Sequence, residues 1–325
     1  MKKIPSLILL LGLSQQCFCW GFYAHRKINY QAVFLLPPEM MVLYKPYIVF
    51  LEEHAIDPDK RRYAVSDEGQ KHYIDIDHYG SYPYSALPRK WEDAIAKYSE
   101  DSVRAYGIVP WWLQIMQQRL TKAFKDKNQA MILKYSAEIG HYIADSHVPL
   151  HTTKNHNGQY TDQKGIHGFW ESRVPELLAE TDWDLFIGKA EYIKNPADFI
   201  WARVMESAAA VDTVLKYEKE LSLQFPGDQK FSFEERNGIT IRQYSTAFTK
   251  AYDAKLKGMV ERRMRQSIYA IASFWYTAWV NAGQPDLSKL SNKEFSAEDL
   301  KEFESLNTAW KNAGIKGREH ETPNP

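Results

Sequence analysis

The sequence predicts an all-α protein that forms a single compact multi-helix domain. Apolar residues recur at helical spacing over most of the 325 residues, and stretches with strand-like alternation are few. Apolar residues make up 44% of the chain and charged residues 25%, a composition that supports a core and excludes a disordered or collagen-like chain. No repeat, low-complexity segment or clear linker divides the chain, so we expect one helical domain.

The individual helices follow from apolar spacing and from the residues that end them. The first covers residues 22–36 and stops at Pro37-Pro38, because proline cannot continue a helix. Residues 152–165 are polar and predict a loop. Further helices are expected over residues 39–55, 91–106, 111–125, 128–145, 167–179, 197–223, 241–282 and 292–312.

The two ends of the chain predict an export signal and a disordered tail. Met1-Lys2-Lys3 precede an apolar run that is too short to span a membrane, and Cys17 and Cys19 stand where signal peptidase needs small side chains. We therefore expect a signal peptide over residues 1–19, a domain over 20–316 that begins at Trp20, and a tail over 317–325. The protein would be exported, either periplasmic or secreted, without a transmembrane segment.

Charge and cysteine content narrow the chemistry that is available. Lys and Arg number 41, as do Asp and Glu, so no basic surplus points to nucleic acid or to a membrane surface. Both cysteines of the chain lie in the predicted signal. The mature chain would have no disulfide, and any metal site must use His, Asp, Glu and main-chain ligands.

The histidines are concentrated in one half of the chain and stand near carboxylates. Nine of the ten precede residue 168. His141 and Asp145 are four residues apart, as are His167 and Glu171, which places each pair on one face of a helix. One such pair is commonplace on a helix surface, but two pairs with further candidates nearby favour a multinuclear metal site. The further candidates are His25, Asp57, Asp59, His72 and His151.

These motifs, in this order, resemble the superfamily of bacterial zinc-dependent phospholipases C and single-strand-specific zinc nucleases of fungi and plants. The resemblance covers roughly residues 20–180, with helices but no matching motif after them. It rests on Trp20-Gly21 followed by His25, on His72-Tyr73-Ile74-Asp75, on His141 with Asp145 and His151, and on His167 with Glu171.

The resemblance implies a cleft that holds three zinc ions. One ion would be held by Asp59, His72, His141 and Asp145. A second would be held by His151, His167 and Glu171. The third would be held by the amino group and carbonyl oxygen of Trp20, by His25, and by Asp145 as a bridge.

Two assignments remain open in this ligand set. Asp57 is the alternative to Asp59, but Pro58-Asp59-Lys60-Arg61-Arg62 is similar to the nuclease pattern Pro-Asp-x-x-Arg and favours Asp59. The Arg of that pattern contacts phosphate, which implies this role for Arg62, with Arg61 as the alternative. Glu171, in contrast, is similar to the phospholipase branch, because the nucleases favour Asp at this place.

The resemblance implies a zinc-dependent phosphodiester hydrolase in which metal-activated hydroxide attacks phosphorus and Asp59 and Arg62 take part in catalysis. Glu171, the balanced charge and the absent cysteines narrowly favour a phospholipase C-like enzyme that acts on phospholipid. Arg62 favours the alternative, a single-strand-specific nuclease of the endonuclease/3'-nucleotidase type. Tyr73 is a candidate platform for a base or a lipid headgroup, although core packing is the commoner role of such a ring.

A non-catalytic metal-binding or adhesion protein is the alternative of a different class. The complete ligand sets argue against it, because a site that is no longer used would be expected to lose some of its ligands. No stable protein partner is expected in either case.

Overall fold

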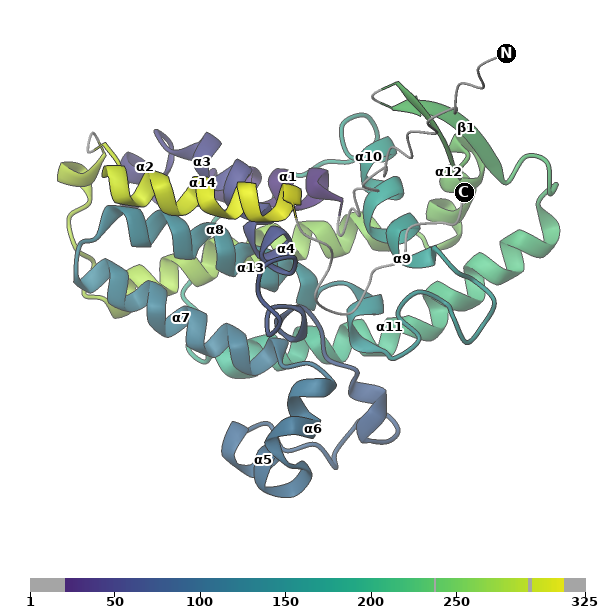
Figure 1. Ribbon diagram of the computed structural model, residues 1–325, viewed down its shortest axis with the longest axis horizontal. Helices are drawn as coiled ribbons and strands as arrows, with labels where there is room; N and C mark the ends of the chain where they lie inside the picture. The colour runs from purple at the N-terminus through teal and green to yellow at the C-terminus, as the bar shows by residue number, and fades with distance from the viewer. Residues whose placement is uncertain (1–20, 237, 292–293, 313–325) are drawn as a thin grey trace, which may run out of the picture.

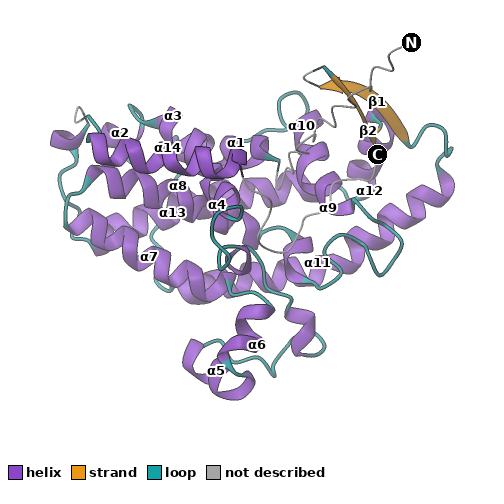
Figure 2. Ribbon diagram, in the orientation of Figure 1, coloured by secondary structure: helices purple, strands orange, loops and turns teal. Residues whose placement is uncertain are grey.

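The structure, a computed structural model, describes residues 21–236, 238–291 and 294–312. It confirms the all-α class: in the described residues, helices surround the core and a two-stranded hairpin is the only sheet (Figures 1 and 2). The predicted signal peptide, Trp20 and the predicted tail lie outside the described residues. With η marking 3-10 turns and, for η5, a π-helical turn, the elements are α1 (Phe22–Val33), α2 (Pro38–Tyr44), α3 (Ile48–Glu53), η1 (His54–Ile56), α4 (Asp57–Arg61), η2 (Gly69–Lys71), η3 (Ile76–Tyr79), α5 (Trp91–Tyr98), α6 (Glu100–Ala105), α7 (Val109–Lys125), α8 (Gln129–Ser146), η4 (Pro149–Thr152), α9 (Ile166–Gly168), η5 (Phe169–Arg173), α10 (Val174–Leu178), α11 (Pro196–Gln224), β1 (Phe231–Arg236), β2 (Ile239–Tyr244), α12 (Thr246–Lys255), α13 (Met259–Asn281), η6 (Ser288–Leu290) and α14 (Ala297–Asn312).

Helix α8 is the central helix of the core. It packs against α1, α3, α7 and α13, and every residue from Ser136 to Leu150 is buried. Two contacts at Ser136 fasten it to its neighbours: the indole Nε1 of Trp275 donates to the carbonyl of Ser136 (3.0 Å), and the hydroxyls of Ser136 and Tyr44 lie 2.7 Å apart. Because its C-terminal half is buried on all sides, α8 holds the side chains there in fixed positions.

Helix α1 packs on α8 at a point where a glycine of α8 faces it. Asn29 of α1 donates from Nδ2 to the carbonyls of Ala137 (3.0 Å) and Leu51 (3.2 Å). A Cβ atom at Gly140 would collide with the Asn29 amide. The buried amide therefore docks α1 on α8, and His25, one turn before Asn29 on the same face of α1, is carried to the same place.

The predicted helix over residues 241–282 is wrong in part. Strand β2 occupies its start, and the remainder is split between α12 and α13 at Lys257-Gly258, which both have positive φ (55° and 67°). Strand β2 pairs antiparallel with β1, with Phe231 opposite Tyr244 and Phe233 opposite Arg242. The missed signal is Asn237-Gly238, a dipeptide that favours the turn of a two-residue hairpin.

Three other predicted helices are interrupted. Residues 39–55 are divided among α2, α3 and η1, residues 91–106 are divided between α5 and α6 at Ser99 (φ 66°), and residues 167–179 are divided among α9, η5 and α10. Apolar spacing continues across each of these breaks, so the pattern by itself does not reveal them.

Two peripheral elements complete the arrangement. Helices α5 and α6 project from the body on one side, and α14 lies along the opposite side, where it packs on α4 (Figure 1). Within the described ranges, every helix is too short or too polar to cross a membrane.

Candidate metal centre

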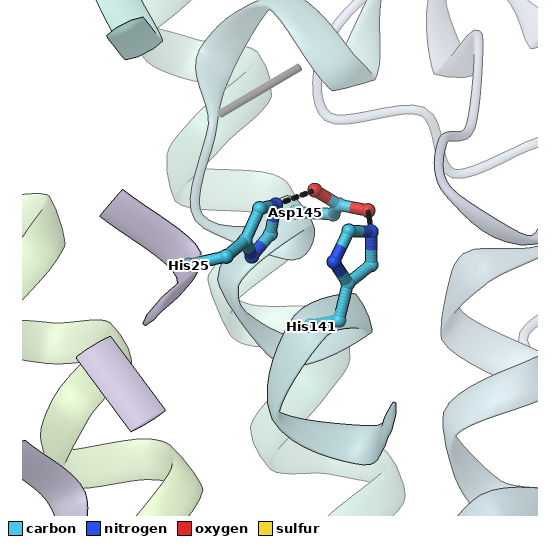
Figure 3. A group of neighbouring side chains, drawn as sticks. All are labelled: His25, His141 and Asp145. Carbon is cyan, nitrogen blue, oxygen red and sulfur yellow. Dashed lines mark ion pairs between the residues drawn. The ribbon is translucent and has the colours of Figure 1, made fainter. Parts of the chain in front are cut away.

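The carboxylate of Asp145 faces four histidine side chains in the protein interior. Its Oδ1 lies 3.4 Å from His25 Nε2 and 3.9 Å from His151 Nε2. Its Oδ2 lies 3.0 Å from His72 Nδ1 and 3.3 Å from His141 Nε2. Figure 3 shows His25 and His141 at the two oxygens of this carboxylate. Because each oxygen faces a different pair of imidazoles, the carboxylate is placed to bridge two metal ions.

Three groups of potential ligand atoms meet around Asp145. Within each group the ligand atoms lie within 4.8 Å of one another, and all of the residues are buried. The first group and the second share His141, and the third contacts Asp145 through His151. The groups are His25 with His141 and Asp145, Asp59 with His72 and His141, and His151 with His167 and Glu171.

The first group joins α1 to α8. The ring of His25 stacks on the ring of His141, with the centroids 3.8 Å apart. Asn29 and Gly140 set this distance, because they hold the two helix backbones together one turn from His25 and one residue from His141. Packing of α1 on α8 therefore places His25 beside Asp145, two of the ligands predicted for the third zinc ion.

The second group joins the short helix α4 to α8. Asp59 Oδ1 lies 3.6 Å from His141 Nε2 and 3.8 Å from His72 Nδ1. Neither oxygen of Asp59 accepts a hydrogen bond from any described residue, although the residue is only 3% exposed. Burying a carboxylate without hydrogen bonds is costly, so these oxygens have the environment of metal ligands.

Asp57 and Arg61, the alternatives to Asp59 and Arg62, have other partners in the structure. Asp57 belongs to none of the three groups and pairs with His54 (2.5 Å) and Lys60 (2.9 Å) instead. Arg61 pairs with Glu138 (2.7 Å). Arg62 lies beside Asp59 instead, with its Nη1 3.8 Å from Asp59 Oδ1.

The third group is carried by shorter elements. His151 lies in η4, His167 in α9, and Glu171 in the π-helical turn η5. Glu171 Oε2 lies 3.1 Å from His167 Nε2 and 3.3 Å from His151 Nε2, and the two Nε2 atoms are 3.2 Å apart. A π-helical turn inside a helical segment is common at functional sites.

The tautomers of these histidines fit a metal and fit poorly without a cation. His141, His151 and His167 each donate Nδ1–H to a main-chain carbonyl, of Ala55 (2.9 Å), His72 (2.6 Å) and His156 (3.0 Å) respectively. In the neutral ring, Nε2 is then an acceptor that faces other acceptors. Ligands at about 2.0–2.2 Å from a tetrahedral zinc ion stand about 3.3 Å apart, close to the separations seen here. Nitrogen and carboxylate ligands without cysteine are typical of catalytic zinc.

Neighbouring charges oppose the effect of burial on these groups. Burial lowers the pKa of His141, but Asp145 and Asp59 raise it to about 9. Burial lowers the pKa of His72 to about 4. Burial raises the pKa of Glu171, but His167 and His151 lower it to about 2. Without metal, the centre therefore holds ionised Glu171 and protonated His141 at neutral pH.

The residue that follows the predicted N-terminus is fixed next to the third group. The main-chain N–H of Gly21 donates to Ser172 Oγ (2.9 Å), and a Cβ atom at Gly21 would lie 2.9 Å from the Cβ of Ser172. Ser172 is the neighbour of Glu171 in η5. Trp20 itself lies outside the described residues, so its role as a ligand stays a prediction.

Tyr73 is a mostly buried ring. It is 9% exposed, it packs closely against Gly107, and its hydroxyl donates to the carbonyl of Ala105 (3.3 Å). These contacts favour the packing role, and contact with substrate stays a prediction.

Sequence reasoning missed the residues that support the ligands. Glu68 is buried with its Oε1 3.8 Å from His72 Nε2, and Asn29 docks α1. Glu68 precedes His72 by four residues, the same spacing as the two recognised pairs in reverse order, and this was the available signal. Asn29 had none, because its partner is remote in sequence.

Residues 24–219 match the zinc-dependent phospholipase C family, and this range is more than half of the 325 residues. The range contains every predicted ligand except Trp20. No curated protein matches the chain. The match supports a zinc-dependent phosphodiesterase or phospholipase type of function, consistent with the ligand groups around Asp145. The chain belongs to the zinc-dependent phospholipase C family.

Proposed function

We propose that the protein is an exported phospholipase C-like enzyme that uses zinc to hydrolyse the phosphodiester bond of phospholipids. The observation that carries the proposal is the carboxylate of Asp145 between four buried histidines, in a chain of the zinc-dependent phospholipase C family. Family membership points to a lipid substrate, and Glu171, four residues after His167, agrees with the phospholipase branch.

We assign one zinc ion to Asp59, His72, His141 and Asp145, and a second to His151, His167 and Glu171. A third is assigned to Trp20, His25 and Asp145, with Asp145 shared between the first and third ions. Bound there, zinc supplies Lewis acidity and a water-derived nucleophile near neutral pH. Asp145 holds two of the groups together, and the main-chain carbonyls behind His141, His151 and His167 keep their Nε2 atoms directed inward.

Arg62 and Asp59 are the proposed catalytic residues outside the histidine set. The guanidinium of Arg62 supplies positive charge beside Asp59, where it can bind a phosphate oxygen as negative charge develops. Asp59 has two oxygens without a hydrogen-bond partner in the described residues, so it can hold metal with one and orient a water molecule with the other.

A nuclease that acts on single-stranded nucleic acid is the second candidate. The observation that favours it is the position of Arg62 rather than Arg61 beside Asp59, as in the Pro-Asp-x-x-Arg pattern of the zinc nucleases. A balanced net charge does not exclude this substrate, because stacking of bases on aromatic rings contributes affinity.

One assay with two substrates distinguishes these functions. The secreted protein, loaded with zinc, is incubated in parallel with phosphatidylcholine vesicles and with single-stranded DNA. Release of phosphocholine with intact DNA is expected. Cleavage of DNA with intact lipid would overturn the proposal in favour of the nuclease. Cleavage of neither, at full zinc content, would favour the non-catalytic class.

The proposed role of the N-terminus gives a second test. A version with Met placed before Trp20 displaces the free α-amine from its ligand position, so it should contain one zinc ion fewer per protein than the secreted form. Metal content is measured by mass spectrometry of both purified forms. Equal content would contradict Trp20 as a ligand.

A further inference from the structure

A network of charged side chains around the buried Glu68 lies behind His72, on the side away from the ligand groups. Glu68 is fully buried (0% exposed), and its Oε2 accepts a hydrogen bond from Lys71 Nζ (2.7 Å). Its Oε1 accepts a hydrogen bond from the hydroxyl of Tyr142, and Arg61 Nε lies 3.8 Å from Oε2. Glu68 is therefore a carboxylate that its cationic neighbours hold in place next to an imidazole.

His72 differs from the other histidines of the second and third groups in the nitrogen that it presents. His141, His151 and His167 point Nε2 inward and donate Nδ1–H to main-chain carbonyls. His72 points Nδ1 inward, 3.0 Å from both Asp145 Oδ2 and His141 Nε2. Its Nε2 has no hydrogen-bond partner in the described residues and faces Glu68 Oε1 at 3.8 Å.

This orientation determines where the ring proton of His72 must be. A nitrogen that binds a metal ion carries no proton, so a neutral imidazole bound through Nδ1 has its proton on Nε2. A buried N–H needs an acceptor, and the acceptor that faces Nε2 is the Glu68 carboxylate.

We propose that Glu68 is a positioning residue that accepts the Nε2 proton of His72 and so selects the tautomer in which His72 binds metal through Nδ1. The proposal rests on the proposed zinc centre, but it does not depend on the substrate. The separation of 3.8 Å exceeds a hydrogen bond, so the proposal requires the ring and the carboxylate to approach when metal binds.

Tyr142 connects this carboxylate to the ligand helix. It follows His141 in α8, and its hydroxyl donates to Glu68 Oε1, the oxygen that faces His72. The same helix that carries His141 and Asp145 therefore also orients the carboxylate behind His72.

Glu138 provides a matched control. It is a second buried carboxylate, 5% exposed, and it pairs with the same guanidinium, with Arg61 Nη2 2.7 Å from its Oε1. Replacing Glu138 perturbs the shared charge network without removing the group that faces His72.

The experiment measures zinc affinity without substrate, by competition with a chromophoric chelator. Glu68→Met keeps the side-chain length but removes the acceptor, and it should weaken zinc binding about 10–100-fold, the usual cost of losing a hydrogen-bond partner of a ligand histidine. Glu138→Met should leave the affinity unchanged, and Glu68→Gln, which keeps an amide acceptor, should recover most of the loss. In the zinc-loaded wild type, nitrogen-15 NMR of the histidines should show the His72 proton on Nε2.

Two results would overturn the proposal: an equal loss of zinc affinity in Glu68→Met and Glu138→Met, or a His72 proton on Nδ1 in the loaded protein. If Glu68→Met does not fold, Tyr142→Phe replaces it. A smaller loss of zinc affinity is expected in Tyr142→Phe, because Glu68 keeps its charge. An unchanged zinc affinity in Tyr142→Phe would overturn the proposal. A wild type that binds zinc but cleaves neither substrate refutes the proposed function and leaves this inference standing. A wild type that binds no zinc overturns both.

Discussion

The two His/carboxylate pairs of the centre have the same spacing but lie in different surroundings. His141 and Asp145 belong to the continuous helix α8, in a stretch where every residue is buried. His167 and Glu171 lie across the junction between α9 and the π-helical turn η5. Polar contacts hold that junction: the Asn157 amide oxygen accepts from the main-chain N–H of His167 (3.4 Å) and of Gly165 (2.9 Å).

The hairpin also contributes to the second pair. Arg173, at the end of η5, donates from Nε to the carbonyl of Tyr244 (3.0 Å) and from Nη1 to Glu234 (3.1 Å). The comparison shows that one ligand spacing can be supported in two ways, by hydrophobic packing or by hydrogen bonds from loops and a hairpin. Substitutions should therefore affect the two pairs differently.

Asp145→Asn should have the largest effect, because the carboxylate faces histidines of all three groups. We expect loss of zinc from more than one site and a fall in hydrolysis of more than about 100-fold, beyond the cost of losing a single supporting contact. Zinc per protein and initial rates are measured on the same sample. Asp126→Asn, an exposed carboxylate in the turn between α7 and α8, is the control. Full zinc occupancy in Asp145→Asn would refute the bridging role.

Glu171→Gln should have a more limited effect on metal content. Glu171 contacts His151 and His167 and belongs to one ligand group, so we expect loss of one zinc ion per protein while the ions at the other groups remain. Metal analysis after dialysis checks this. Loss of as much zinc as in Asp145→Asn would mean that the His141/Asp145 and His167/Glu171 pairs act as one unit, contrary to their separate support.

The pH dependence of zinc binding should report on His141. Because its pKa in the metal-free protein is about 9, His141 is protonated at pH 7 and must lose a proton to bind zinc. His72, with a pKa of about 4, is already neutral and releases none. Apparent zinc affinity should therefore rise about tenfold per pH unit for each displaced proton, and the contribution of His141 should level off above pH 9.

Calorimetry in buffers of different ionisation enthalpy gives the number of protons released. At least one should be released per protein at pH 7. A heat of binding that is independent of the buffer would contradict a protonated His141.

The glycines beside the two pairs provide the smallest and most specific test. Gly140 precedes His141 and faces Asn29, whereas Gly168 follows His167, has an ordinary helical φ of −62° and has no atom within 4 Å of an added Cβ. Gly140→Ala should lower the free energy of unfolding by about 1–3 kcal/mol through overpacking. Gly168→Ala should be neutral or raise it by up to about 1 kcal/mol, because alanine favours a helix.

Thermal unfolding of the metal-free variants measures both changes. Equal destabilisation would show that the two pairs are supported in the same way, contrary to the comparison. Zinc affinity should fall in Gly140→Ala, because the shift of α1 moves His25 away from His141.

The ligand pairs were accessible from the sequence because helical spacing is a local property. His141 with Asp145 and His167 with Glu171 need one turn of backbone, and the structure brings both pairs to one centre. The supports were not accessible, because they depend on remote partners: Asn29 bonds a carbonyl 108 residues later, and His151 bonds the carbonyl of His72, 79 residues earlier. The hairpin was missed because the helix predicted over residues 241–282 begins inside strand β2, where apolar residues also recur.

By itself, the sequence determined the helical class and the order of the candidate zinc-ligand motifs, because composition, periodicity and spacing are properties of consecutive residues. Only the tertiary structure separated Asp59 from Asp57 and Arg62 from Arg61, and only it decided which nitrogen each imidazole presents. The reason is physical: the direction of a buried side chain is set by packing and by hydrogen bonds to groups distant in sequence, and these exist only once the chain is folded.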